Sequence, residues 1–194
     1  MKNLFFALVF CLGITGISLF AFEPEDLTKY PSAVPANSFA ANIGIGFNSP
    51  EYGDLTVPPL SASLDYNLPI RGLPFFVGGI VGFYGSFAES GAGATKIESS
   101  YTVFDIGARF GYHFNWGVDG LDTYAIATLG LALESAQVKW GSYYNSGDTT
   151  DSDTSLLFGV AIGARWFFTP VIGVFLELGY SALSFASTGL SIHF

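Results

Sequence analysis

The stretch YTVFDIGARFGYHF, residues 101–114, alternates large apolar side chains with small or charged ones. Successive side chains of a β-strand point to opposite faces, so this pattern predicts a strand with two different faces. One face carries the large row Phe104, Ile106, Ala108, Phe110, Tyr112 and Phe114. The other carries Asp105, Gly107, Arg109, Gly111 and His113. The fold depends on which of the two faces is the outer one.

The same period of two recurs along the rest of the chain. Strands are predicted at residues 37–47, 60–68, 75–87, 101–114, 123–134, 156–168, 171–183 and 186–194. Each is long enough to cross a bilayer at a tilt, which takes about 9–11 residues. The connections after the first, third and fifth strands are long, and those after the second, fourth and sixth are short. Alternating long and short connections are typical of outer-membrane barrels. Only the short link between the last two strands departs from this pattern.

Composition favours a membrane-facing surface. Hydrophobic residues make up 50% of the chain and charged residues only 12%, whereas a soluble domain has about 25% charged residues. The formal net charge of −9 excludes nucleic acid as an expected partner.

Alternation alone fits either a soluble, lipocalin-like barrel or an outer-membrane barrel. The polar row consists mostly of Gly, Ser, Ala and Asn, which suit a narrow eight-stranded interior. The large row would overfill that interior, and closure removes sheet edges that lipid cannot solvate. We therefore predict an all-β, eight-stranded antiparallel up-and-down transmembrane β-barrel over residues 37–194, with its N-terminus and short turns in the periplasm.

Ahead of the barrel, MKNLFFALVFCLGITGISLFAF has one lysine, an apolar run and the small residue Ala21. This order predicts a cleavable signal peptide, residues 1–21, although Leu19 is larger than the preferred residue before a cleavage site. The rival interpretation is an uncleaved membrane helix. Cys11, the single cysteine, lies inside this segment, so the mature chain would have no disulfide. Residues 22–36 are expected to form a periplasmic leader.

The chain ends on TGLSIHF, residues 188–194. A glycine, alternating apolar residues and a final aromatic resemble the C-terminal signal of bacterial outer-membrane proteins. The matching residues are Gly189, Leu190, Ile192 and Phe194. In that family the barrel-assembly machinery reads the last strand, so the resemblance implies this machinery and periplasmic chaperones as partners during biogenesis.

The barrel region as a whole resembles the small eight-stranded barrels. These are the transmembrane domain of outer membrane protein A, outer membrane proteins X and W, and opacity-type proteins. Residues 163–180, GARWFFTPVIGVFLELGY, are especially similar to the last hairpin of this family, and the overall character is similar to spirochaetal sequences.

Charged side chains on the polar row are the first candidate site. We expect them to form a lumen ion-pair network, because buried charges must be paired. Its predicted members are Asp65, Asp105, Arg109, His113, Glu134, Arg165, Glu177 and His193. Either this network is a plug organised by Arg109 and Arg165, or it lines a gate or narrow solute path.

Aromatic residues near the strand ends predict two girdles at the lipid–water interfaces. The set is Tyr101, Phe104, Tyr112, Phe114, Trp116, Trp140, Trp166, Phe168 and Tyr180. Trp140 and its neighbours Tyr143 and Tyr144 have an alternative interpretation as an adhesive patch on the third long loop.

No residue pattern predicts a catalytic, metal or cofactor site. Some small outer-membrane barrels are lipid A deacylases or palmitoyltransferases with a histidine near the outer leaflet. His113 and His193 are predicted at the periplasmic ends instead, which leaves no base for a Ser nucleophile there. Asp148, Asp151 and Asp153 lack the Gly and closing Glu of a calcium loop, and SGAGATK lacks the spacing of a phosphate loop.

We therefore expect a non-enzymatic protein of the bacterial outer membrane, exported by its signal peptide and in contact with lipid. Its predicted role is structural or surface-interactive, like an adhesin or antigen, through the extracellular loops and an unidentified host or surface ligand. The alternative is a narrow passive channel for small or hydrophobic solutes.

Overall fold

The computed structural model describes residues 33–47, 54–70, 73–144, 147–180 and 184–194. Within these ranges, eight antiparallel strands close into one barrel, and the first strand pairs with the last. The strands are β1 (Phe39–Phe47), β2 (Asp54–Asn67), β3 (Phe75–Ser90), β4 (Ile97–Phe114), β5 (Leu121–Trp140), β6 (Thr149–Phe167), β7 (Ile172–Tyr180) and β8 (Ala186–His193). Single 3-10 turns, η2 (Gly93–Thr95) and η3 (Ser142–Tyr144), lie at two of the connections. The predicted up-and-down order is confirmed.

The N-terminal predictions lie largely outside the described residues. This applies to the signal peptide, residues 1–21, and to the leader as far as residue 32. Of the leader, Val34 is buried. Asn37, the first residue of the predicted barrel, adopts a positive φ of 59° just before β1. In the part of the chain that the structure describes, no helix is long and apolar enough to cross a membrane.

The two faces of the sheet divide as predicted. Large apolar side chains cover the outside: Leu129 is 63% exposed and Ile162 is 65% exposed. Polar and charged side chains fill the inside, where Asp65, Arg109 and Arg165 are buried. Where all eight strands lie side by side, the closed sheet pairs each strand with both of its neighbours and its exterior is apolar, as a lipid environment requires.

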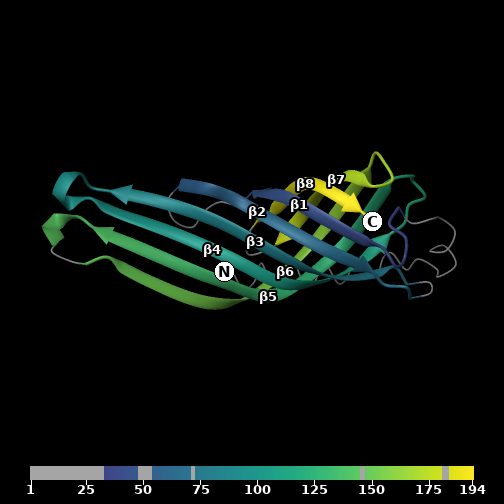
Figure 1. Ribbon diagram of the computed structural model, residues 1–194, viewed down its shortest axis with the longest axis horizontal. Helices are drawn as coiled ribbons and strands as arrows, with labels where there is room; N and C mark the ends of the chain where they lie inside the picture. Colours follow the sequence, from purple (N-terminus) through teal and green to yellow (C-terminus); the bar gives the residue numbers. More distant parts are fainter. Residues whose placement is uncertain (1–32, 48–53, 71–72, 145–146, 181–183) are drawn as a thin grey trace, which may run out of the picture.

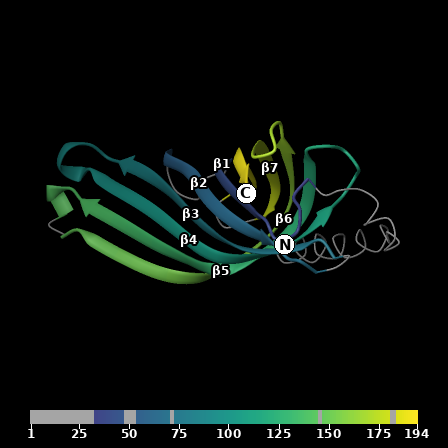
Figure 2. The same cartoon turned by 45° about the vertical axis from the view of Figure 1, so that its right-hand side comes forward.

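The strands differ greatly in length, and the long ones lie together. β4, β5 and β6 have 18, 20 and 19 residues, whereas β1, β7 and β8 have 9, 9 and 8. Figures 1 and 2 show β3 to β6 continuing toward the left, well past β7 and β8. We call the far part of these strands the projecting sheet: residues 86–90, 97–103, 134–140 and 149–155.

This projecting sheet corrects the prediction of long loops at residues 88–100 and 135–155. Strand pairing continues to Ser90 opposite Ile97 and to Val138 opposite Thr149, which leaves only short connections. Both faces of these segments are polar or mixed, so alternation disappears from the sequence although backbone pairing does not. The same holds for β2, which begins at Asp54 instead of residue 60. Its pairing shifts register around Pro58 and Pro59, because proline has no N–H to donate.

Candidate functional site

A group of buried charges spans the barrel interior at the level of the short turns. We call it the interior cluster. It contains Asp65 from β2, Arg109 and His113 from β4, Asp122 from β5, Arg165 from β6 and Glu177 from β7. All six are at most 9% exposed, so each charge must be balanced by a partner inside the barrel.

Arg165 is the centre of this cluster and is fully buried. Its guanidinium donates to the carboxylates of Asp65 and, at 3.0 Å, Asp122. Its Nε donates to Asn42 Oδ1 at 3.2 Å. The guanidinium carbon also lies 4.2 Å from the ring centroid of Tyr124, within cation–π range. Two carboxylates, an amide and an aromatic ring therefore surround one cation. This arrangement suits arginine, whose planar guanidinium presents several N–H donors in fixed directions.

Arg109 forms the second half of the cluster. Its Nη2 lies 2.7 Å from Glu177 Oε1, and its Nε lies 3.2 Å from Asp65 Oδ1. The Tyr124 hydroxyl donates to the same Glu177 oxygen at 2.8 Å. Asp65 therefore joins both arginines, and the two halves form one connected network.

These pairings differ from the neighbours that strand order suggests. Arg165 and Glu177 lie on adjacent strands, and Asp105 and Arg109 share a face of β4, yet neither pair forms an ion pair among the contacts of the described residues. The arginine side chains also reach across the lumen: both contact Asp65 of β2, and Arg109 contacts Glu177 of β7, so only the Arg165–Asp122 pair joins adjacent strands.

His113 extends the network toward the N-terminal end of β1. Its Nδ1 lies 2.6 Å from Asp122 Oδ1, and its Nε2 lies 2.8 Å from Asn67 Oδ1. The Asn67 amide nitrogen donates to the backbone oxygen and hydroxyl of Ser38, which turns its oxygen toward the imidazole. Both ring nitrogens thus lie within hydrogen-bond distance of a side-chain oxygen.

Asp122 was not among the predicted lumen residues, because residues 115–122 were assigned to a turn. In the structure β5 begins at Leu121, and Asp122 points inward two residues before Tyr124. The signal was present, since inward positions recur at every second residue and Glu134, twelve residues after Asp122, was already predicted to be inward.

Large rings also fill the interior, and each rests on a glycine of a nearby strand. Phe76 faces Gly111, where an added Cβ would lie 2.2 Å from the Phe76 ring. Tyr124 faces Gly163 in the same way, with a corresponding distance of 2.4 Å. The inner row was predicted to be small, and these glycines are the reason it can hold rings: a missing side chain on one strand leaves room for a ring from another.

The other predicted lumen residues lie apart from the cluster. Asp105 and Glu134 are farther along β4 and β5, toward the projecting sheet. Glu134 accepts hydrogen bonds from the hydroxyls of Tyr101 and, at 3.0 Å, Ser155. His193 lies at the end of β8, where its Nδ1 is 3.3 Å from the Pro170 carbonyl oxygen. Three of the eight predicted residues are therefore outside the interior cluster.

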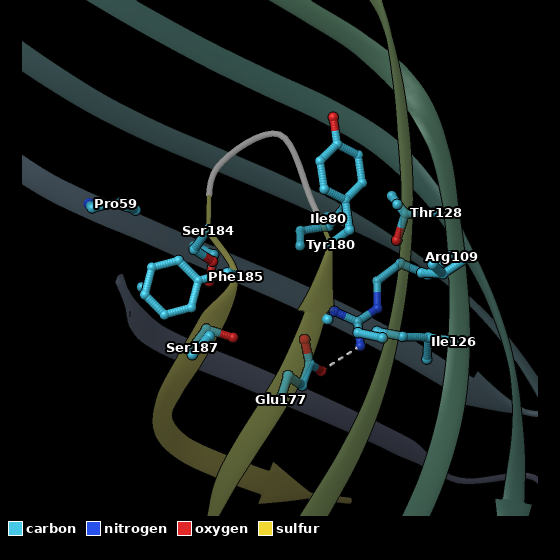
Figure 3. A pocket seen from close by; sticks show the side chains of 17 residues that line it. Pro59, Ile80, Arg109, Ile126, Thr128, Glu177, Tyr180, Ser184, Phe185 and Ser187 are labelled. Atoms are coloured by element: carbon cyan, nitrogen blue, oxygen red, sulfur yellow. Dashed lines mark hydrogen bonds and ion pairs between the residues drawn. The ribbon is translucent and has the colours of Figure 1, made fainter. Parts of the chain in front are cut away.

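A small cavity of about 50 Å³ separates the cluster from the β7–β8 connection. Figure 3 shows Arg109 and Glu177, joined by their hydrogen bond, on one side of it, with Ser184 and Phe185 on another. This volume holds about one or two water molecules. The interior cluster therefore fills the lumen at this level.

The predicted aromatic girdles require two corrections. Tyr101 has the inward parity of β4; its hydroxyl bonds Glu134 and its ring lies 6.2 Å from that of Tyr84. Trp140 lies at the far tip of β5, well past Leu133, and contacts Tyr144 at 5.6 Å between ring centroids. The remaining predicted girdle residues lie on the outer surface or at its rims: Phe104, Tyr112, Phe114, Trp116, Trp166, Phe168 and Tyr180.

The C-terminal residues close the barrel. Leu190 and Ile192 point outward beside β1. Phe194 exchanges backbone hydrogen bonds with Phe39, at 3.0 and 2.7 Å, and their rings stack at 5.7 Å. The predicted assembly signal therefore lies at the seam between the first and last strands.

Charge is distributed unevenly over the projecting sheet and its connections. The acidic side chains are Glu89, Glu98, Glu134, Asp148, Asp151 and Asp153, and the basic ones are Lys96 and Lys139. Among the described residues, β6 pairs with β7 only from Val160 onward. Over residues 149–159, one edge of β6 is paired with β5 and the other has no strand partner in the part of the chain that the structure describes. Two of its N–H groups, at Ser152 and Thr154, are bonded by the carboxylates of Asp151 and Asp153.

The comparison with protein families agrees with this geometry. The family described as outer membrane protein beta-barrel domain matches residues 17–193. The chain belongs to this family of outer-membrane barrels. The family assignment places the apolar exterior in contact with outer-membrane lipid, and it confirms the resemblance inferred from the sequence.

Solved structures with the same fold come from Thermus thermophilus and Yersinia pestis. A major outer membrane protein of Thermus thermophilus aligns with a TM-score of 0.56 and 12% identity, covering 81% of this chain and 99% of that one. Ail, the attachment invasion locus protein of Yersinia pestis, aligns with a TM-score of 0.51 and 16% identity, covering 82% and 100%. A second Ail structure, in complex with the heparin analogue sucrose octasulfate, aligns with a TM-score of 0.50 and 15% identity, covering 81% and 97%. A search among curated proteins found no match. At these identities the shared property is the barrel fold.

Proposed function

We propose that the barrel anchors the projecting sheet in the outer membrane, and that the sheet binds a partner outside the cell. The observation that carries this proposal is the edge of β6 over residues 149–159, which has no strand partner among the described residues and extends past the ends of β7 and β8. An exposed strand edge is a template for an extended segment of another protein.

The charges favour a basic extended segment as the partner. An added strand would displace the carboxylates of Asp151 and Asp153 from the edge N–H groups, and these carboxylates would then contact its side chains. A second copy of this chain fits poorly, because its own acidic edge would meet the same charges. A polyanion such as the heparin analogue bound to Ail meets the same repulsion, so that ligand does not carry over.

The filled lumen supports an anchoring role over a channel. Ion pairs join two arginines, three carboxylates and a histidine across the lumen, where a solute would have to pass. The cavity beside them is only about 50 Å³. We further propose that residues 1–21 direct export, that residues 22–36 form the leader, and that the strand ending at Phe194 is read during barrel assembly.

A variant with a shortened projecting sheet tests this function. Gly85 is paired with Thr102, and Leu133 with Thr154, so the residues between each pair, which include Asp151 and Asp153, can be replaced by an Asn-Gly turn. We expect the shortened variant to refold, as shown by heat-modifiable gel mobility, and to lose binding to a surface coated with polylysine or to host cells. Equal binding by the shortened variant and the full chain would overturn the proposal.

A single substitution tests the edge itself. Ser152→Pro removes an N–H that faces away from β5, so pairing with β5 should survive while strand addition is blocked. Binding that is insensitive to this substitution would contradict addition at the β6 edge. Planar-bilayer conductance of the refolded protein provides the complementary measurement, since stable open-channel currents would favour the narrow-channel alternative.

A further inference from the structure

Asp105 is a buried carboxylate that the interior cluster does not use. It lies on β4, opposite Gly82 of β3 and Ala132 of β5, and is 1% exposed. Neither of its carboxylate oxygens has a hydrogen-bond partner among the described residues. An ionised carboxylate in this state is strongly destabilising unless a counter-charge accompanies it.

The nearest charged neighbours of Asp105 are acidic. Glu134 projects from β5 to the same side as Asp105, diagonally placed because it pairs with Val103. Asp153 of β6 is directly opposite Glu134. Carboxylates placed opposite each other on one face of a sheet repel, so three strands converge on an uncompensated negative region.

No cation of the described interior is placed to neutralise this region. Arg109, the next basic residue along β4, is held by Asp65 and Glu177 at the opposite side of Gly107. Glu134 has two hydroxyl donors, Tyr101 and Ser155, and these bring no charge. Asp105 is therefore neutralised either by a proton or by a cation that comes from outside the described protein atoms.

We propose that Asp105 and Glu134 together bind a hard divalent cation of the calcium class. Carboxylate and water oxygens are the ligands such ions take, usually six to eight in number. The described residues hold no group of three or more His, Cys, Asp or Glu side chains arranged around a metal. Two carboxylates therefore share the ion with water, which places the affinity in the weak range, with a Kd of about 10⁻⁴–10⁻³ M. This site is independent of the partner proposed for the projecting sheet.

Terbium luminescence is a direct probe of this site. Tyr101 donates to Glu134 and lies 6.2 Å from Tyr84, so excited tyrosine should sensitise a bound Tb³⁺ ion. With the refolded full chain in detergent, we expect a saturable signal that Ca²⁺ displaces. Asp105→Asn and Glu134→Gln should each weaken Tb³⁺ binding by about tenfold or more, because each removes a charged ligand.

Glu98→Gln is the matched control. Glu98 lies on the same strand as Asp105 but on its opposite face, where it pairs with Lys96. Its loss should leave the Tb³⁺ signal unchanged. Equal weakening in Glu98→Gln and Asp105→Asn, or a wild-type signal that does not saturate, would overturn the proposal.

A measurement on the unmodified protein covers the case in which Asp105→Asn does not fold. Ca²⁺ should raise the urea midpoint of unfolding relative to a chelator, because an ion that binds only the folded state stabilises it. An identical midpoint with Ca²⁺ and with chelator would mean that Asp105 is neutralised by a proton instead of a metal ion, and would reject the site.

Discussion

Arg165 on β6 donates a hydrogen bond to Asp65 on β2, although 100 residues separate them in the chain. β2 and β6 are not neighbours in the sheet, so this contact crosses the lumen. A sheet closed only by hydrogen bonds along its wall could leave its interior open or flattened. Cross-lumen ion pairs join opposite walls and fill the space between them.

Replacing Arg165 should therefore destabilise the barrel strongly. Arg165→Met leaves Asp65 and Asp122 buried without their cation, and breaking a buried pair in this way costs about 3–5 kcal/mol. Urea unfolding in detergent micelles measures the change in the free energy of unfolding. Arg165→Lys serves as the control and should retain part of the stability, because it keeps the charge but not the fork. A loss below about 1 kcal/mol for Arg165→Met would contradict the bracing role.

The ring-on-glycine contacts predict a steric effect inside the barrel. In Gly111→Ala the new methyl group would lie 2.2 Å from the ring of Phe76, which is fully buried. Overpacking of this kind typically costs about 1–3 kcal/mol in the free energy of unfolding. Gly79→Ala on β3 is the control, since its Cβ would meet only a backbone oxygen at 3.7 Å.

A double mutant checks the assignment of this effect. Phe76→Leu combined with Gly111→Ala should recover part of the stability lost by Gly111→Ala, because the smaller side chain vacates the contested space. Additive losses in the double mutant would show that the two residues do not compete.

The free-energy cost of placing an arginine on the outer face should depend on the depth of the substituted residue in the membrane. Leu129 and Gln137 point outward from the same strand, β5, but Leu129 lies within the apolar belt and Gln137 on the projecting sheet. Leu129→Arg should cost about 2–4 kcal/mol when unfolding is measured in phospholipid bilayers, and Gln137→Arg close to zero. Similar costs at both positions would place the membrane boundary elsewhere on β5.

The tip of the β3–β4 hairpin should respond to acid. Lys96 Nζ lies 3.0 Å from Glu89 Oε2 and 2.7 Å from Glu98 Oε1. The hydrogen bond from Lys96, followed by its charge, lowers the pKa of Glu98. Stability from this pair is therefore fully present above the ordinary pKa of a glutamate, and it is lost as pH falls through the lowered pKa of Glu98.

Amide hydrogen exchange at residues 91–98 measures this local opening. Protection should decrease on acidification in the wild type, after correction for intrinsic exchange rates. In Lys96→Gln it should be lower at neutral pH and less sensitive to acid. An equal pH response in the two proteins would show that the ion pairs do not hold the tip.

The alternation of residue types along the chain was sufficient to predict the barrel. In residues 101–114 a period of two separates bulky apolar side chains from small and charged ones, and no tertiary information is needed to see that one face suits lipid. The predicted inward positions of Asp65, Arg109 and Arg165 follow from the same parity, because a strand side chain can reach only one of two faces.

Only the tertiary structure decided which charges meet and where the strands end. Arginine side chains reach across the lumen, so Arg165 pairs with Asp65 of β2 although Glu177 lies on the adjacent strand. Asp122 joins the cluster because β5 begins earlier than its turn-like sequence indicates. Alternation did not reveal the projecting sheet, since both of its faces carry polar or mixed side chains while backbone pairing continues. The face to which a strand side chain points is a local property that can be read from the sequence. The ion-pair partner that the side chain meets depends on how the barrel closes and how wide it is.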